Sequence, residues 1–483
     1  MVSPTKEQCD QLLNIGGIPK PDPDISGIGV LIAFILSAYM TFAFVLLAYI
    51  FGMVEENLLN QIDRRIFKIK PYNYGRPRMH IAIRKVVLAL GDQQIVTGIA
   101  ILGAAFQGLR NGSISVYHYQ IAIYLAWMSS SVHLSAVTVL GDFLTKNKGL
   151  MVWRVAGMLV LLAMLIIGLV PTVSNDWAVI YWNGMLPEHT GYGLPATCFW
   201  GQLYGDGLNA DSIIGLLILF SSYMWKMGGL SSTAGKWYNY YIRASQEGIA
   251  IKLLTYTARK CRGRRSIWWR CAYRASLAIT LPLFAVLEML ASFAASLWLS
   301  GLGLVFGSMQ VFIPRLQNIW YTETAEQAWT FGQLLPLILL VVPLATISEH
   351  IWPEDNMGSC VARNVGISRQ LGHCLDDVSP DCDHSLHRYL VRRDKPDLGS
   401  ATSVQARVLE FLYESRLFAA IVWLLQCSIV ATAAVVFELD AYSIGYYRGS
   451  DWQLFAVSGG ACIGAMWIFV LAILPFSRLG KLQ

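Results

Sequence analysis

The stretch LGDQQIVTGIAIL, Leu90–Leu102, places three adjacent polar side chains inside a long apolar run. The run covers about 86–109, and about 20 helical residues are enough to cross a hydrocarbon core about 30 Å thick. An unpaired charge in lipid costs roughly 2.5–3.5 kcal/mol, so Asp92, Gln93 and Gln94 need protein or water around them. The stretch therefore predicts a membrane helix whose polar residues face other helices.

The rest of the chain has the same apolar character. Of 483 residues, 55% are hydrophobic and 14% are charged, whereas soluble domains have about 25% charged residues. The apolar runs are continuous rather than alternating, which predicts helices. We expect an all-α, polytopic transmembrane helical bundle with about nine spans, at 28–53, 86–109, 116–140, 151–173, 211–228, 276–308, 330–347, 416–437 and 454–476.

The positive charges of the connecting segments predict the orientation. Lys and Arg are frequent in 54–85, 229–275 and 348–415 but absent from 174–210. Connecting segments with many Lys and Arg residues alternate along the chain with segments that have few. Positive residues stay on the cytoplasmic side of a membrane. We therefore expect the N-terminus outside and the C-terminus in the cytosol.

The same pattern predicts four regions. Residues 1–27 form an outer N-terminal arm without the apolar core of a cleaved signal peptide. Residues 28–347 form the main membrane bundle, which includes the basic cytosolic segment. Residues 348–415 form a cytosolic insert, and residues 416–483 hold the last two spans and a short tail. We expect a multi-pass integral protein of the plasma membrane or an endomembrane.

The connecting segments also predict partners. The net charge of +6 is explained by cytosolic residues that meet anionic lipid headgroups, so we expect membrane lipids and no nucleic acid. Segment 229–275 mixes basic and aromatic residues, which predicts one or two helices on the inner leaflet. The outer segment predicts either an aromatic belt at the headgroups or the mouth of a cavity, built from Trp177, Tyr181, Trp182, Tyr192, Trp200 and Tyr204.

A short turn joins the spans at 86–109 and 116–140, which predicts an antiparallel hairpin. Residues equally far from the turn lie at the same depth, so Asp92 should face His133 and Gln94 should face Ser131. The region is either an interhelical hydrogen-bond latch or a proton or ion path, since histidine titrates near neutral pH. The predicted substrate-binding or polar path consists of Gln93, Gln94, Ser129 and Ser131.

Glu288 is a second acid in an apolar run. It follows Arg274 by about 14 residues, which at 1.5 Å per residue predicts a position near the bilayer midplane. Such an acid is a functional candidate, or alternatively a neutral structural acid held by hydrogen bonds. The candidate catalytic residues are therefore Glu288, Asp92 and His133.

The cysteines divide by topology. Cys9 and Cys198 are the two that lie outside in this topology, so we expect a disulfide between them, because the cytosol keeps thiols reduced. The insert contains a Cys and His set whose spacing matches no zinc pattern, and we predict no metal and no cofactor. The members of that set are Cys360, His373, Cys374, Cys382, His384 and His387.

Two stretches resemble a known family. They are Asp92-Gln93-Gln94 followed by Val96-Thr97-Gly98, and SISVYHYQIAIYLAWMSSSVHLSAVTVL at 113–140. Both resemble fungal polytopic membrane proteins catalogued as elsinochrome biosynthesis-associated, after a secondary-metabolite gene cluster. The resemblance is specific over roughly 86–140 and looser over the first seven spans. It implies a fungal membrane protein beside a polyketide or terpenoid pathway, and it transfers no catalytic residue.

Three classes of function fit these observations. A membrane-bound terpene cyclase or isomerase would use Glu288 or Asp92 as a general acid on a lipophilic small molecule. A channel or transporter would line its path with Asp92, His133 and Glu288, although the chain has no ATPase motif and no obvious internal repeat. A scaffold or sensor would use the cytosolic insert. The sequence favours a membrane protein of secondary metabolism.

Overall fold

The computed structural model describes most of the predicted membrane region. It covers 4–70 except 16 and 18, 77–174, 191–200, 210–230, 244–263, 267–318, 329–341, 412–446 and 451–474, with the single residues Trp177, Leu208, Tyr241, Pro343 and Ala345. These parts of the chain contain helices and two isolated bridges but no strand. The all-α class is therefore confirmed.

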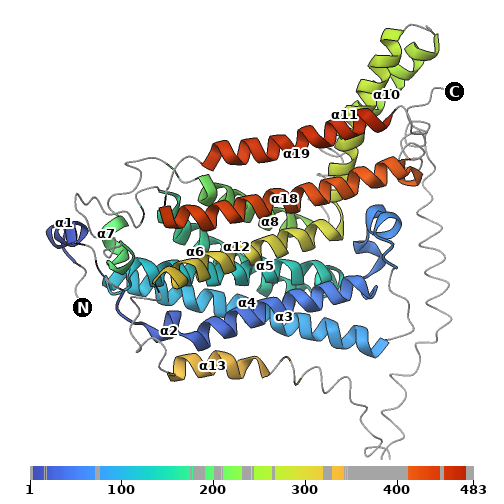
Figure 1. The fold of residues 1–483 in the computed structure, drawn as a ribbon. Coiled ribbons are helices and arrows are strands. Elements are labelled where there is room, and N and C mark those ends of the chain that lie inside the picture. Colours follow the sequence, from blue (N-terminus) through green and yellow to red (C-terminus); the bar gives the residue numbers. More distant parts are fainter. Residues whose placement is uncertain are drawn as a thin grey trace, which may run out of the picture.

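The long helices run side by side except α10, which projects from one end of the bundle (Figure 1). They are α3 (Ile28–Ile50), α4 (Pro77–Asn111), α5 (Val116–Lys146), α6 (Lys148–Leu169), α8 (Ala210–Leu230), α10 (Ala244–Gly263), α11 (Ile267–Leu290), α12 (Phe293–Asn318), α18 (Arg416–Tyr446) and α19 (Asp451–Ile473). The short helices are α1 (Lys6–Ile15), α2 (Pro23–Ser26), α7 (Ala196–Trp200) and α13 (Phe331–Leu339). Single turns of 3-10 helix lie at Glu56–Leu58, Pro171–Val173 and Gly191–Gly193, and a π-helix at Ile62–Ile66.

Seven helical segments in the described ranges are long and apolar enough to cross a membrane. One of them is formed by α2 and α3 together, and the other six are α4, α5, α6, α11, α12 and α18. The predicted spans at 211–228 and 454–476 correspond to α8 and α19, and α13 covers part of the predicted 330–347 span. A multi-pass membrane protein agrees with this set of helices, and the count of nine spans and the orientation remain predictions.

The predicted single span at 276–308 is wrong, because the chain breaks into α11 and α12. The hydroxyl of Ser292 accepts a 3.1 Å hydrogen bond from a backbone N–H in the first turn of α12. The carboxylate of Asp63 accepts two more, from Phe293 (3.0 Å) and Ala294 (3.3 Å). The first N–H groups of a helix have no partners inside it, so these oxygens stabilise a new helix start.

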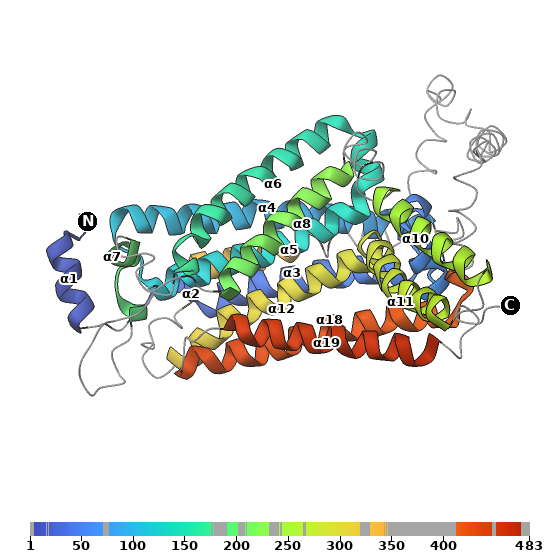
Figure 2. The same ribbon diagram turned by 90° about the horizontal axis from the view of Figure 1, so that it is seen from above.

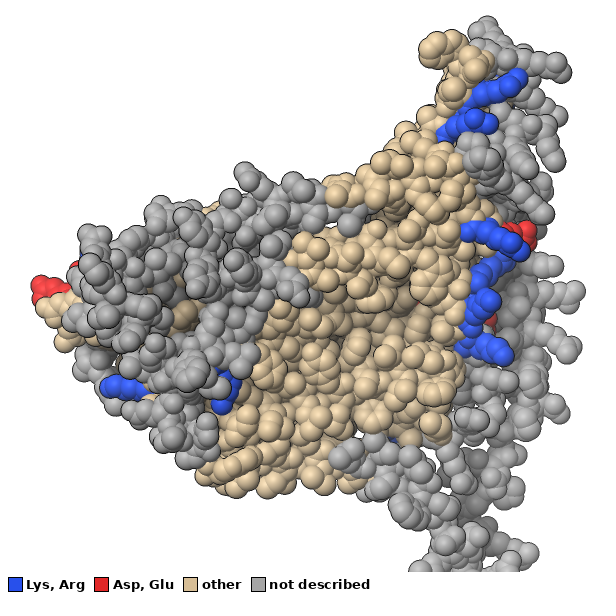
Figure 3. Space-filling view, viewed as in Figure 1, with Lys and Arg blue, Asp and Glu red and all other residues tan. Residues whose placement is uncertain are grey.

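The two ends of the bundle differ in charge. In both ribbon views α1 and α7 lie at one end and α10 projects at the other, where it packs against α11 (Figures 1 and 2). The visible Lys and Arg side chains of the described residues gather mainly at the α10 end, beside a broad zone without charged side chains (Figure 3). An apolar zone next to a basic end is the pattern expected of a membrane bundle.

Helix α5 forms the centre of the bundle. It is the most thoroughly buried of the seven apolar segments, and it packs against α3, α4, α6, α8 and α12. Its neighbours approach closely because they present glycine: a Cβ on Gly303 would lie 2.5 Å from Ser131 Oγ, and one on Gly307 would lie 2.5 Å from Met128 Cγ. Small residues at such crossings are how membrane helices come close enough to pack.

The predicted hairpin of α4 and α5 is confirmed. Gly91 lies against Ala136, and Gly98 lies against Ser129, so the two helices pair within a residue or two of the predicted register. Gly112 makes the turn with a φ of +63°, which glycine adopts at low cost. Ser115 then caps α5, since its side chain accepts a hydrogen bond from the backbone of His118.

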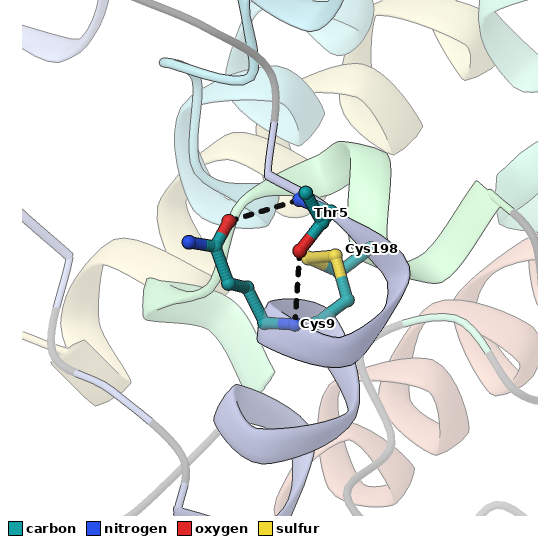
Figure 4. Close-up of a disulfide and its surroundings, with 4 residues drawn as sticks. Thr5, Cys9 and Cys198 are labelled. Atoms are coloured by element: carbon teal, nitrogen blue, oxygen red, sulfur yellow. Dashed lines mark hydrogen bonds between the residues drawn. A yellow bond between two sulfur atoms is a disulfide. The ribbon is translucent and has the colours of Figure 1, made fainter.

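A disulfide attaches the N-terminal arm to the segment before α8. It joins Cys9 of α1 to Cys198 of α7, whose Cα atoms are 5.1 Å apart (Figure 4). This is the pair that the topology predicted. Helix α1 begins with a capping box, in which the Thr5 backbone N–H donates to Gln8 Oε1 (2.9 Å) and the Gln8 N–H to Thr5 Oγ1 (3.4 Å).

Trp177 does not belong to an aromatic belt. Its side chain is 1% exposed, and its ring centroid lies 5.7 Å from that of Tyr119 and 6.0 Å from that of Phe199. The side chain therefore contacts other protein rings instead of lipid headgroups, because the rings pack on one another at the outer end of α5. Tyr181, Trp182 and Tyr204 lie outside the described residues.

Candidate functional site

Asp92 is held by Arg154 rather than by His133. Arg154 Nη2 lies 2.6 Å from Asp92 Oδ1, and the same nitrogen donates to the carbonyl of Leu88 (2.9 Å). The side chain of Arg154 is 4% exposed and that of Asp92 is 40% exposed, so the pair lies at an edge of the bundle between α4 and α6. The predicted contact is a direct or one-water hydrogen bond between Asp92 and His133. The direct form is wrong, because the carboxylate pairs with Arg154 of α6, and the one-water form stays a prediction.

The sequence contains a signal for this ion pair. Arg154 is the one Lys or Arg within the predicted span at 151–173. A cation in a membrane helix needs an acid or a carbonyl at its own depth, and Asp92 and the Leu88 carbonyl supply both. Asp92 and Arg154 therefore stabilise the packing of α4 on α6.

His133 belongs to a buried hydrogen-bond chain between α5 and α8. Ser130 Oγ donates to the Tyr223 hydroxyl (2.9 Å), which lies 3.3 Å from His133 Nε2. His133 Nδ1 lies 3.1 Å from the carbonyl of Ser129. All groups are satisfied when Nδ1 carries the proton and Tyr223 donates to Nε2. The sequence missed Tyr223, because nothing marks it as a partner of a residue 90 positions earlier.

The predicted polar path does not form one continuous line. Gln94 Nε2 donates to Ser37 Oγ of α3 (2.7 Å), and Ser131 Oγ donates to the carbonyl of Trp127 (3.1 Å). The predicted pairing of Gln94 with Ser131 is therefore wrong. Gln93 is half-buried, and its carbonyl accepts a hydrogen bond from Thr97 within α4.

Two buried oxygens near this region have no protein partner among the described residues. They are Gln94 Oε1 and Ser129 Oγ. A buried polar atom without a hydrogen bond costs roughly 1–3 kcal/mol. These two oxygens therefore offset part of the stability that the packing of α4 on α5 supplies, whereas the amide nitrogen of Gln94 is bonded to Ser37 of α3.

Glu288 lies at the end of the bundle where α3 and α4 are connected, not at its middle. Asn60 Nδ2 donates to the backbone carbonyl of Glu288 (2.7 Å), and Asn60 belongs to the connection that the charge pattern places in the cytosol. This contact argues against the predicted midplane position, although Arg274 and Glu288 lie 14 residues apart in the unbroken helix α11. The Glu288 side chain is buried.

Asp63 is a buried acid that the sequence did not single out. Tyr49 donates its hydroxyl proton to Asp63 Oδ1 (2.7 Å), and the backbone N–H of Asn60 donates to Oδ2 (3.1 Å). The same carboxylate caps α12. Asp63 therefore connects α3, the π-helical turn and α12, and all its acceptor capacity is used within the protein. Its sequence context, IDRRIFK, is that of an ordinary basic connection.

A further group of polar residues, around Lys226, was not predicted from the sequence. The Lys226 ammonium donates to Thr138 Oγ1 of α5, and Thr138 Oγ1 lies 3.0 Å from Ser296 Oγ of α12. The predicted span at 211–228 contains Lys226 as its one cation, so a sequence signal existed here too. The group brings α5, α8 and α12 together.

A pocket of about 330 Å³ opens beside this group, between α8, α12, the end of α11 and α18. Its wall is mostly apolar and includes Leu299, Leu302 and Ile429. Trp225 and Leu290 also line it and are 41% and 52% exposed, so the pocket opens on the side of the bundle. Asp92, His133 and Glu288 do not line it.

The structure offers no group of three or more potential metal ligands among its described residues. The Cys and His set of the insert lies outside those residues. Three of the polar residues discussed above, Asp63, Asp92 and His133, make hydrogen bonds or ion pairs between helices.

Comparison with known proteins identifies two relatives from the fungus Elsinoe fawcettii. The chain is 37% identical to elsinochromes biosynthesis cluster protein HP3 over 119 residues, which are 25% of this chain and 47% of HP3. It is 22% identical to elsinochromes biosynthesis cluster protein HP2 over 325 residues, which are 60% of this chain and 82% of HP2. The matched part thus spans about half the length of HP3.

Neither a protein-family model nor a solved structure matches the chain. The two fungal relatives agree with the resemblance predicted from the segment 86–140. The chain is therefore related to the elsinochromes biosynthesis cluster proteins HP3 and HP2.

Proposed function

We propose that this protein holds a lipophilic small molecule of a secondary-metabolite pathway in the pocket between α8, α12 and α18. The relatives HP3 and HP2 are named for a biosynthesis cluster, which supports a place in such a pathway. The observation that carries the proposal is the pocket: it is mostly apolar, it opens on the side of the bundle, and its polar groups are confined to one lysine and three serines.

The size of the pocket suits a small molecule. Ligand sites of proteins are typically clefts of about 300–1,000 Å³, mostly apolar with a few placed polar groups, and this pocket has about 330 Å³. Since its mouth faces the side of the bundle, a lipophilic molecule would enter from the hydrocarbon region of the membrane. Entry from lipid removes the need for an aqueous path past Asp92 and His133.

Acid–base catalysis on the bound molecule, such as a terpenoid cyclisation, is a second and finer proposal. Glu288 is the candidate acid that adjoins the pocket, since the next two residues, Met289 and Leu290, line it. Asp92 is ion-paired at another interface. If Glu288 is the general acid, the Glu288→Gln variant still binds the molecule but no longer converts it. A variant that loses both binding and turnover, or that keeps both, contradicts this role.

The binding proposal is tested by filling the pocket. Ala295 lines it, and Ala295→Trp should block it, whereas Val152→Trp adds the same side chain on the exposed face of α6, where Val152 is 64% exposed. A strain that lacks the gene is complemented with each variant, and its lipophilic metabolites are compared by mass spectrometry. We expect Ala295→Trp to resemble the deletion and Val152→Trp to resemble wild type. Wild-type metabolites from well-expressed Ala295→Trp would contradict the proposal.

A further inference from the structure

The pocket has one charged residue, and it lies at the polar end. Lys226 lines the wall together with Ser222 of the same helix and Ser296 of α12. The remaining wall is apolar apart from Ser221. The ammonium of Lys226 therefore lies next to a hydrocarbon-like space, with its polar neighbours gathered on one side.

Lys226 is not neutralised by the described part of the protein. Thr138 accepts its hydrogen bond, and no described carboxylate lies within ion-pair distance of it. An ammonium has three N–H donors, and a single hydroxyl uses one of them. A charge beside apolar surface is costly unless an opposite charge or further acceptors meet it. An anionic group inside the pocket would supply both.

Glu288 adjoins the pocket but does not line it, and two further acids of the described residues are committed to other partners. Asp63 caps α12 and binds Tyr49, and Asp92 pairs with Arg154. The start of α12, which also borders the pocket, has its first N–H groups capped by Asp63 and Ser292. Lys226 is therefore the group at this pocket that is left to attract an anion.

We propose that the pocket takes a lipophilic acid: a molecule with a hydrocarbon or aromatic body and a carboxylate or phenolate that pairs with Lys226. This inference rests on the proposed function, since it specifies the ligand of the same pocket. The apolar wall holds the body, and Trp225 and Trp298 at the mouth offer faces on which a ring can stack. The hydroxyl of Ser222 donates to the carbonyl of Ile218 within α8, so the Lys226 ammonium is the donor that meets the anionic group.

The inference is tested with a matched pair of probes. Full-length protein in phosphatidylcholine nanodiscs is titrated with 11-(dansylamino)undecanoic acid and with its methyl ester, and energy transfer from tryptophan to dansyl reports binding. We expect the acid to bind about ten-fold more tightly than the ester. Lys226→Met should abolish this preference and leave ester binding unchanged, whereas Lys226→Arg should keep it. The control Lys252→Met removes an exposed lysine of α10 and should change nothing.

The outcomes separate the inference from the proposed function. If the ester and the acid bind equally, or if folded Lys226→Met keeps the preference, the pocket holds lipophilic molecules but Lys226 does not select an acid. If neither probe binds, both proposals are wrong. A membrane lipid phosphate is the other source of an anion: displacement of the acid by a few mole per cent of phosphatidylglycerol would overturn the small-acid ligand, and persistence of binding supports it.

Discussion

At the scale of single residues, the face of the helix on which a polar residue lies decides its partner more than its depth in the membrane does. Asp92 and His133 lie on paired helices at similar depth, yet Asp92 contacts α6 and His133 contacts α8. Successive helical residues point about 100° apart, so a shared depth leaves the direction of each side chain open. A charge then takes whichever neighbour neutralises it, and for Asp92 that neighbour is Arg154.

We expect Arg154→Met to lower stability by about 1–3 kcal/mol, because it leaves the Asp92 carboxylate without its cation. Since Asp92 is 40% exposed, water offsets part of this cost. Asp92→Asn combined with Arg154→Met should destabilise less than the sum of the single changes. Thermal unfolding in detergent provides the measurement, with Arg110→Met, at an exposed position in the last turn of α4, as the control. Additive single and double variants would contradict the ion pair.

The buried hydrogen bonds from Ser130 through Tyr223 to His133 predict a difference in stability between two Tyr→Phe variants. Tyr223→Phe removes the hydroxyl that bonds both Ser130 Oγ and His133 Nε2 in a buried site, which should cost about 1–3 kcal/mol. Tyr39→Phe is the matched control, because it removes an exposed hydroxyl bond to Ser308 and should cost less than about 0.5 kcal/mol. The unfolding midpoints of the two variants in nanodiscs are compared. Equal shifts of the two midpoints would show that the buried hydrogen bonds of Tyr223 add nothing to the stability of the protein.

At the scale of helices, one buried acid decides where α12 begins. The sequence from 276 to 308 is apolar apart from Glu288 and a few small polar residues. Two of the three hydrogen bonds that cap the start of α12 come from Asp63, more than 200 positions earlier. The carboxylate is also favoured by the positive end of the α12 dipole. The break places Glu288 beside the connection between α3 and α4, and it places Ser296 beside the pocket.

We expect Asp63→Ala to destabilise the protein by about 2–4 kcal/mol, because the start of α12 and Tyr49 lose their acceptor together. Asp63→Asn should be milder, since one oxygen still accepts. The control is Glu56→Gln, which alters the exposed pair with Arg64 and should cost less than about 1 kcal/mol. The measurement is the unfolding midpoint. An Asp63→Ala variant as stable as Glu56→Gln would contradict the capping role.

At the scale of the whole molecule, the two ends of the bundle carry different chemistry. The disulfide of Cys9 and Cys198 lies at the α1 end, and the basic residues gather mainly at the α10 end (Figure 3). Disulfides persist in oxidising compartments, and positive residues stay in the cytosol. The two rules rest on different residues, and both predict that the α1 end lies outside and the α10 end lies in the cytosol.

This orientation predicts which cysteines react from outside. In intact cells, a membrane-impermeant maleimide should label Cys9 and Cys198 only after an impermeant reductant has opened the disulfide. Cys271 is a free, exposed thiol of α11 and should be labelled only after permeabilisation, which makes it the control. Peptide mass mapping identifies the labelled sites. Labelling of Cys271 in intact cells would reverse the orientation, and labelling of Cys9 without reductant would exclude the disulfide.

Continuous apolar runs and short turns determined a large part of this protein. They were enough to predict the all-α class and the α4–α5 hairpin, because both depend on local composition and on the length needed to cross lipid. Charge in the connections, together with position along the chain, was also enough to pair Cys9 with Cys198. The resemblance of the segment 86–140 pointed to the relatives that comparison found.

The tertiary structure alone decided the partners of the buried polar residues and the place of the pocket. Asp92 meets Arg154, His133 meets Tyr223, and Asp63 meets the start of α12. Each contact depends on the rotation of one helix against another, and in a chain of uniformly apolar helices many rotations bury similar area. Buried charges and hydroxyls select among those rotations, because each must find its partner. That selection is what brings Lys226 and Ser296 to the wall of one pocket.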